Sequence, residues 1–118
     1  MIRVSVSLSD EGVIGSLVVE GHAGFALKGT DIVCSAFTIL LRTFARSVEA
    51  SSGVTWEARD AGPGRFQLAV TAVMPTAAEQ YRGWCEFFLR GLGDLSGEQP
   101  QQVQIVYGPM SGRLFHGS

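Results

Sequence analysis

The sequence predicts an α+β domain, a two-layer sandwich in which two helices pack on one face of a mostly antiparallel sheet, in the order ββαββαβ. Three observations support this prediction. Apolar and polar residues alternate in residues 2–8 and again in residues 103–107, two pairs of β-rich segments are joined by turn residues, and two long segments have apolar residues at helical spacing. Hairpins with one face covered by helices are typical of this class.

Residues 1–20 are predicted to form a hairpin. Between residues 2 and 8 every second residue is aliphatic, which places these side chains on one face of a strand. Asp10, Glu11 and Gly12 have the composition of a turn, and residues 13–20 form a second β-rich segment that ends at Gly21.

The first helix is predicted from residue 31 to about residue 50. Its apolar residues recur at steps of three and four, and it contains neither proline nor glycine, so that one face should pack on the core. Gly53 ends this segment. Residues 54–58 and 66–72 are then predicted to form a second hairpin around the turn at residues 62–64.

The second helix is predicted to begin at Pro75 and to end at Gly93, because its apolar residues again form a single stripe between these positions. Residues 103–107 alternate and predict the last strand. We expect residues 108–118 to form a flexible tail.

Composition limits the function classes. The chain has 118 residues, which suits a single domain over residues 1–118, and 46% of them are hydrophobic. A net charge of −2 speaks against the broad basic face of a nucleic-acid-binding protein. The sequence has only two cysteines, no signal-peptide pattern at its start and no apolar stretch of membrane-spanning length. We therefore expect a cytoplasmic protein with neither nucleic acid nor membrane as a partner.

The segment 21–34 carries the candidate chemistry. It places His22 at the end of a predicted strand and Cys34 in the first turn of a predicted helix, with a glycine-rich loop between them. A thiol attacks as the thiolate, and the N–H groups and dipole at a helix start lower the pKa of cysteine. A histidine across the loop could take the thiol proton, which is the minimal arrangement for nucleophilic cysteine catalysis.

Asp31 is the expected N-cap of this helix, because its carboxylate can accept a hydrogen bond from the N–H of Val33 or Cys34. Its charge would oppose a nearby thiolate unless the carboxylate turned to the backbone or to His22. A structural interpretation is also open, in which Cys34 is an inert core residue, His22 caps the strand and the loop glycines only form a tight turn.

A metal or nucleotide site has little support in the sequence. Zinc ligands would have to come from His22, Cys34, Cys85 and His116, which include no short ligand pair. No phosphate-binding or dinucleotide-binding glycine motif is present. We therefore expect neither a metal nor a cofactor.

Trp84, Phe87 and Phe88 form an aromatic cluster in the second predicted helix. The cluster can serve the core or mark a dimer surface, and core packing is the favoured interpretation. Cys85 lies on the face of Trp84 and Phe88 and is expected to be a core residue.

The motif around the two candidate residues resembles that of the bacterial ribosomal-processing cysteine protease family, Prp. The resemblance implies a catalytic dyad of His22 and Cys34 and a cysteine endopeptidase that acts as a homodimer. Its substrate would be a large-subunit ribosomal protein, cut after aromatic residues so that an N-terminal extension is removed. The residues that carry the resemblance are Gly21-His22-Ala23, Gly29, Asp31-Ile32-Val33-Cys34 and Ser35, and those implied to support the dyad or line the substrate cleft are Gly21, Gly24, Gly29, Asp31, Ser35 and Thr38.

Two positions depart from the family pattern. Thr38 stands where many members have serine, and it keeps a hydroxyl on the helical face of Cys34. Phe37 is larger than the small residues expected there and could narrow the cleft or alter its support.

Two other function classes compete with the protease. The first is a non-catalytic ribosome-associated or peptide-binding adaptor domain of the same fold, in which Cys34 would react slowly. The second is a thiol redox sensor, which would need Cys85 as a resolving cysteine near Cys34.

Overall fold

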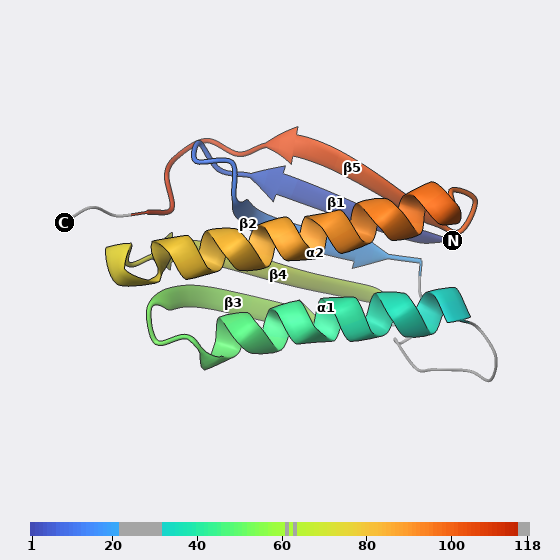
Figure 1. Cartoon of the computed structure of the whole chain (residues 1–118), viewed down its shortest axis with the longest axis horizontal. Helices are drawn as coiled ribbons and strands as arrows, with labels where there is room; N and C mark the ends of the chain where they lie inside the picture. The colour runs from blue at the N-terminus through green and yellow to red at the C-terminus, as the bar shows by residue number, and fades with distance from the viewer. Residues whose placement is uncertain (22–31, 61, 63, 116–118) are drawn as a thin grey trace.

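The computed structural model shows two layers, a five-stranded sheet and two helices that lie side by side across one of its faces (Figure 1). It describes residues 1–21, 32–60, 62 and 64–115. A short 3₁₀ turn, η1, precedes the second helix. The elements are β1 (Ile2–Leu8), β2 (Ile14–Glu20), α1 (Ile32–Ala50), β3 (Val54–Asp60), β4 (Arg65–Val73), η1 (Pro75–Ala77), α2 (Ala78–Glu98) and β5 (Val103–Pro109).

The sheet has the strand order β3-β4-β2-β1-β5. Neighbouring strands are antiparallel except for β1 and β5, which pair in parallel with Ile2 opposite Val103. The parallel pair requires a crossover between distant strands, and α2 supplies it on the helical face. The predicted α+β class, the ββαββαβ order and the mostly antiparallel sheet are confirmed.

The core lies between the sheet and the two helices. Alternate residues of β1 and β2 are buried there, as the period of two predicts. From the helices, Phe44 stacks on Phe88 with ring centroids 4.7 Å apart, and the buried Tyr81 hydroxyl donates a hydrogen bond to the carbonyl oxygen of Ile14. The aromatic contacts of α1 and α2 therefore fix the cysteine-bearing helix on the sheet.

The second helix is longer than the sequence predicts. Gly93 does not end it, and α2 continues to Glu98. A glycine inside a helix costs about 1 kcal/mol, which the additional turn offsets by partly burying Leu95 against the core. Ser96 also donates a hydrogen bond to the carbonyl oxygen of Val103 at 3.0 Å, which joins the helix end to β5.

The predicted tail is wrong for residues 108–115. Gly108 and Pro109 belong to β5, and Leu114 is only 3% exposed. The N–H of Val73 donates to the carbonyl oxygen of Leu114 at 2.8 Å, which attaches this segment to β4. Residues 116–118 lie outside the described part of the chain.

Glu11, in the turn between β1 and β2, binds the end of this segment. Its carboxylate accepts the N–H groups of Leu114 at 3.0 Å and Phe115 at 2.8 Å, and it lies 3.7 Å from Arg113. Arg82 lies over the Phe115 ring, 5.2 Å from its centroid. Burial alone would raise the pKa of Glu11, but the N–H donors outweigh it and lower the pKa to about 2.

This carboxylate should stabilise the fold in a pH-dependent way. The folded pKa is about 2 and the ordinary value is 4.5, so its contribution is complete above pH 4.5 and is lost as the pH falls toward 2. We expect Glu11→Gln to lower the free energy of unfolding by about 2 kcal/mol at pH 7, as for hydrogen bonds to a charged group. In urea unfolding, the difference from the wild type should shrink between pH 5 and pH 2.

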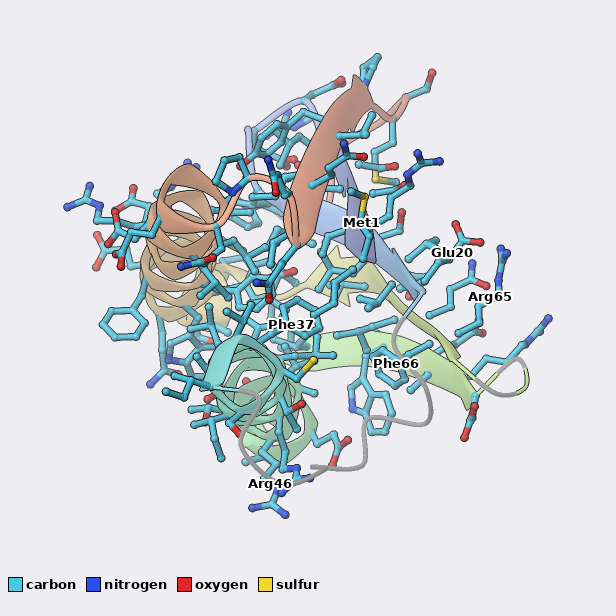
Figure 2. The ribbon with its side chains drawn as sticks, turned by 90° about the vertical axis from the view of Figure 1, so that its right-hand side faces the viewer. Met1, Glu20, Phe37, Arg46, Arg65 and Phe66 are labelled. Atoms are coloured by element: carbon cyan, nitrogen blue, oxygen red, sulfur yellow. The ribbon has the colours of Figure 1, made fainter. Side chains whose placement is uncertain are left out.

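Glu20→Gln is the matched control, because Glu20 makes an exposed ion pair with Arg65 at 3.0 Å (Figure 2). Such surface pairs contribute about 1 kcal/mol or less. A difference between Glu11→Gln and the wild type that stays constant with pH would contradict the assigned role of Glu11.

Candidate active site

Cys34 is the third residue of α1, so its predicted place in the first turn is confirmed. It is half-buried and packs against the hydrophobic core from the edge. The first N–H groups of a helix have no carbonyl partner inside the helix, so they can donate to an anion formed beside the thiol. The position therefore combines access from solvent with donors for negative charge.

Thr38 follows one helical turn after Cys34, on the same face of α1. It is 3% exposed, and its hydroxyl oxygen is buried without a hydrogen-bond partner among the residues that the structure describes. A buried hydroxyl in this condition carries an energetic cost of about 1–3 kcal/mol, which a hydrogen-bonding partner would remove.

Ser35 lies on a different side of the helix. It borders the groove between α1 and α2 together with Ile32 and Ala36. The structure thus places Thr38 on the face of the thiol and Ser35 toward the neighbouring helix.

Gly21 ends β2 with a φ of 85°, a conformation that side-chain-bearing residues rarely adopt. A Cβ at this position would also collide with the carbonyl oxygen of Met1. The Gly21 N–H donates to the carbonyl oxygen of Gly64 at 3.1 Å. Glycine is therefore required where the chain leaves the sheet just before His22.

The other predicted site residues, His22, Gly24, Gly29 and Asp31, lie outside the described residues. The end of β2 and the start of α1, which flank them in sequence, lie at the same end of the molecule (Figure 1). The pairing of His22 with Cys34 and the capping by Asp31 stay predictions.

Phe37 is fully buried between α1 and the sheet (Figure 2). The large side chain therefore belongs to the support beneath the site and does not extend into open space beside Cys34.

Cys85 is 1% exposed, which confirms the prediction that it faces the core, and burial raises the pKa of its thiol to about 11. Cys34 and Cys85 are not joined by a disulfide bond. Within the described ranges, no group of three or more His, Cys, Asp or Glu residues is arranged to hold a metal ion. Over the same ranges, neither helix is long and apolar enough to cross a membrane.

The aromatic cluster of α2 divides between two environments. Phe88 is buried and Trp84 is half-buried, but Phe87 is 75% exposed. Phe87 borders the groove between α1 and α2, which has a volume of about 760 Å³ and an almost entirely apolar lining. Core packing is therefore confirmed for Phe88, and Phe87 contributes to an exposed apolar surface.

A half-exposed thiol in the first turn of a helix, carried on a two-layer α+β frame, fits the class of proteins that use such a cysteine as a nucleophile. Comparison with protein families assigns the chain more closely. The family described as Cysteine protease Prp matches residues 1–104, and the chain belongs to this family.

Two Staphylococcus aureus proteins, each named ribosomal processing cysteine protease Prp, are 37% identical to this chain over 60 residues. The match covers 51% of this chain and 54% of each relative, so it spans about half the length of these curated relatives.

Solved structures confirm the fold. The S. aureus protease Prp in complex with a covalently linked product peptide has a TM-score of 0.74 at 21% identity, over 92% of this chain and all of that one. The same protease in complex with a substrate peptide gives 0.72 at 20% identity with the same coverage. SMU.848 from Streptococcus mutans gives 0.68 at 23% identity, over 95% of this chain and 96% of its own.

Proposed function

We propose that this chain is a cysteine endopeptidase that removes the N-terminal extension of a large-subunit ribosomal protein, with Cys34 as the nucleophile and His22 as its base. The observation that carries the proposal is the half-exposed Cys34 thiol in the first turn of α1, in a chain of the Prp family. The names of the S. aureus relatives support the ribosomal substrate class. The proposal places the protein in the cytoplasm, where ribosomes are assembled.

The reaction needs only protein groups. His22 takes the thiol proton, and the Cys34 thiolate forms a bond to the carbonyl carbon of the scissile peptide. N–H groups of the first helical turn stabilise the oxyanion. The intermediate then expels the amine, which leaves with the proton from His22, and water hydrolyses the thioester to release the acid and the free thiol.

The remaining predicted residues have supporting roles in this proposal. Gly21 gives the chain its turn at the end of β2, and Thr38 offers a buried hydroxyl one turn from the thiol. By resemblance, Asp31 caps the helix, and Gly24 and Gly29 bound the loop that shapes the cleft. Ser35 supports the first turn from the side of the helix groove.

The processing assay tests this function directly. The host ribosomal protein with its extension is incubated with this protein, and intact-mass analysis follows the products. One truncated protein, cut after aromatic residues, is the expected result. An extended substrate that stays whole would favour a peptide-binding adaptor domain instead, and a host protein without the extension would move the search to another target.

We further propose that the protein acts as a homodimer through the groove between α1 and α2. Ile32, Ile39 and Phe87 are 81%, 56% and 75% exposed and border one continuous apolar surface. Contiguous apolar surfaces of this kind on a small domain mark interaction sites, and a second copy presents a surface of the same chemistry.

Phe87→Asp should therefore shift the protein from dimer to monomer, since the change places a charge in the centre of a desolvated interface. Sedimentation velocity over a concentration series would measure the dissociation constant, which we expect to rise at least a hundredfold, about 3 kcal/mol. Tyr107→Asp is the matched control, because Tyr107 is a 52% exposed aromatic residue on β5, away from the groove. Equal dissociation constants for Phe87→Asp and the wild type would contradict this interface.

A further inference from the structure

The side of α1 that carries Cys34 has a hollow further along the helix, distinct from the groove between α1 and α2. Thr38, Leu41, Arg42 and Ala45 follow at helical spacing, and they line a hollow of about 270 Å³. Phe66 of β4 borders the same hollow from the sheet. The thiol and this hollow therefore lie along one flank of the same helix.

The hollow has an apolar floor and a basic rim. Leu41 is 6% exposed, and Ala45 and Phe66 are half-buried. Arg42 and Arg46 are exposed, and Arg46 points away from the core (Figure 2). A floor and rim of this kind suit an apolar side chain beside a negative charge.

Arg42 and Arg46 are not neutralised by an acidic partner among the described residues. Within the part of the chain that the structure describes, neither forms an ion pair or a side-chain hydrogen bond. They are four residues apart on one helix, where like charges repel each other. Glu49 borders the same hollow, but it is a single carboxylate and makes no ion pair with either arginine. Net positive charge therefore remains available to a ligand.

The buried hydroxyl of Thr38 is a second, independent observation at the end of the hollow nearest the thiol. It lines the hollow and has no hydrogen-bond partner among the described residues. Since buried polar groups in native proteins are normally paired, a partner that arrives with a ligand explains this one. A peptide backbone offers both donors and acceptors to it.

We infer that this flank of α1 is an extended substrate subsite, in which Arg42 and Arg46 select an acidic residue at a distance from the scissile bond. The inference rests on the proposed protease function and adds a specificity to it. Along the helix axis, Arg42 lies about 12 Å and Arg46 about 18 Å from Cys34. An extended peptide advances about 3.3 Å per residue, so the acidic residue lies about four to six residues from the bond that is cut.

Synthetic peptides test the charge preference. Each carries Phe-Phe before the cut and neutral residues elsewhere, with Asp, Asn or Lys placed five residues from the cut, on either side in separate sets. On one side we expect kcat/KM to fall in the order Asp, Asn, Lys, with about a tenfold difference between Asp and Lys. The same order should appear in the Kd of the peptides for the Cys34→Ala protein, measured by fluorescence anisotropy, and it should weaken in 1 M salt.

Charge reversal identifies the residues responsible. The double variant Arg42→Glu, Arg46→Glu should reverse the order, so that the Lys peptide is preferred over the Asp peptide. Arg90→Glu is the matched control, because Arg90 is an exposed arginine on α2 that does not line the hollow. It should leave the order unchanged.

The outcomes separate this inference from the proposed function. Peptides that are cut without a charge preference, or with a preference that the double variant keeps, would overturn the subsite and leave the protease function standing. Peptides that bind in the expected order without being cut would support the subsite and count against the protease. Peptides that neither bind nor are cut would overturn both.

Discussion

Cys34→Ala should abolish cleavage of the extended ribosomal protein and leave the fold unchanged. Without the sulfur no thioester can form, so the expected loss of kcat/KM is at least a thousandfold, to the background of the assay. Alanine suits the helix, and Cys34 only packs against the edge of the core, so the melting temperature should change by a few degrees at most. Intact-mass analysis and thermal unfolding on the same preparation measure both effects.

Cys85→Ala is the matched control for this variant. Cys85 is a buried thiol on α2, so its removal should cost about 1–2 kcal/mol of stability while cleavage continues. Cleavage that persists in Cys34→Ala, or that is lost equally in Cys85→Ala, would show that Cys34 is not the nucleophile.

The regular elements could be predicted because their signals are local. The alternation at Ile2, Val4 and Val6 requires only that one face of a strand is buried, and the structure buries all three. The spacing of Phe37, Phe44 and Val48 likewise predicts the buried face of α1, and all three are in the core. The place of Cys34 in the first turn followed from the same helical period.

The features that the sequence did not predict depend on contacts between distant residues. The Glu11 carboxylate accepts a hydrogen bond from the backbone N–H of Leu114, a residue far away in the sequence. No local pattern at either residue predicts this contact, so the sequence analysis treats residues 108–115 as part of a tail. Gly93 resembles a helix end until Leu95 is seen to pack on the core. Phe87 and Phe88 differ in environment because one residue turns the helix by about 100°.

The candidate site was predicted in part. Cys34 and Gly21 have the local positions that the sequence predicts, whereas the sequence analysis does not single out Arg42 or Arg46. The proposed subsite also needs Phe66, which borders the same hollow as the two arginines. Phe66 lies on β4, which follows α1 in the sequence, and only the folded chain brings it beside the helix. A usable signal was present in the spacing of Arg42 and Arg46, which lie four residues apart and therefore close together on the surface of the helix that carries Cys34.

His22→Ala should slow alkylation of Cys34 near neutral pH, and near pH 10 the variant should react at least as fast as the wild type. A cysteine paired with histidine is already a thiolate at pH 6, but an unpaired thiol with a pKa of about 8.5 is less than about 1% ionised there. Because nucleophilicity falls as the pKa falls, the expected loss of iodoacetamide rate at pH 6 is about tenfold or more. The wild type should therefore show a nearly flat pH profile, and the variant should show a single rise as the unpaired thiol ionises.

The second thiol does not confuse this measurement. Cys85 is 1% exposed and burial raises its pKa to about 11, so iodoacetamide reports on Cys34 in the folded protein. His116→Ala provides the matched histidine control and should have the wild-type profile. If the pH profiles of His22→Ala and the wild type were the same, His22 would not control the ionisation of the Cys34 thiol. The base for the reaction would then have to be sought elsewhere, because the other proposed supporting groups, such as the Thr38 hydroxyl, cannot hold the proton at neutral pH.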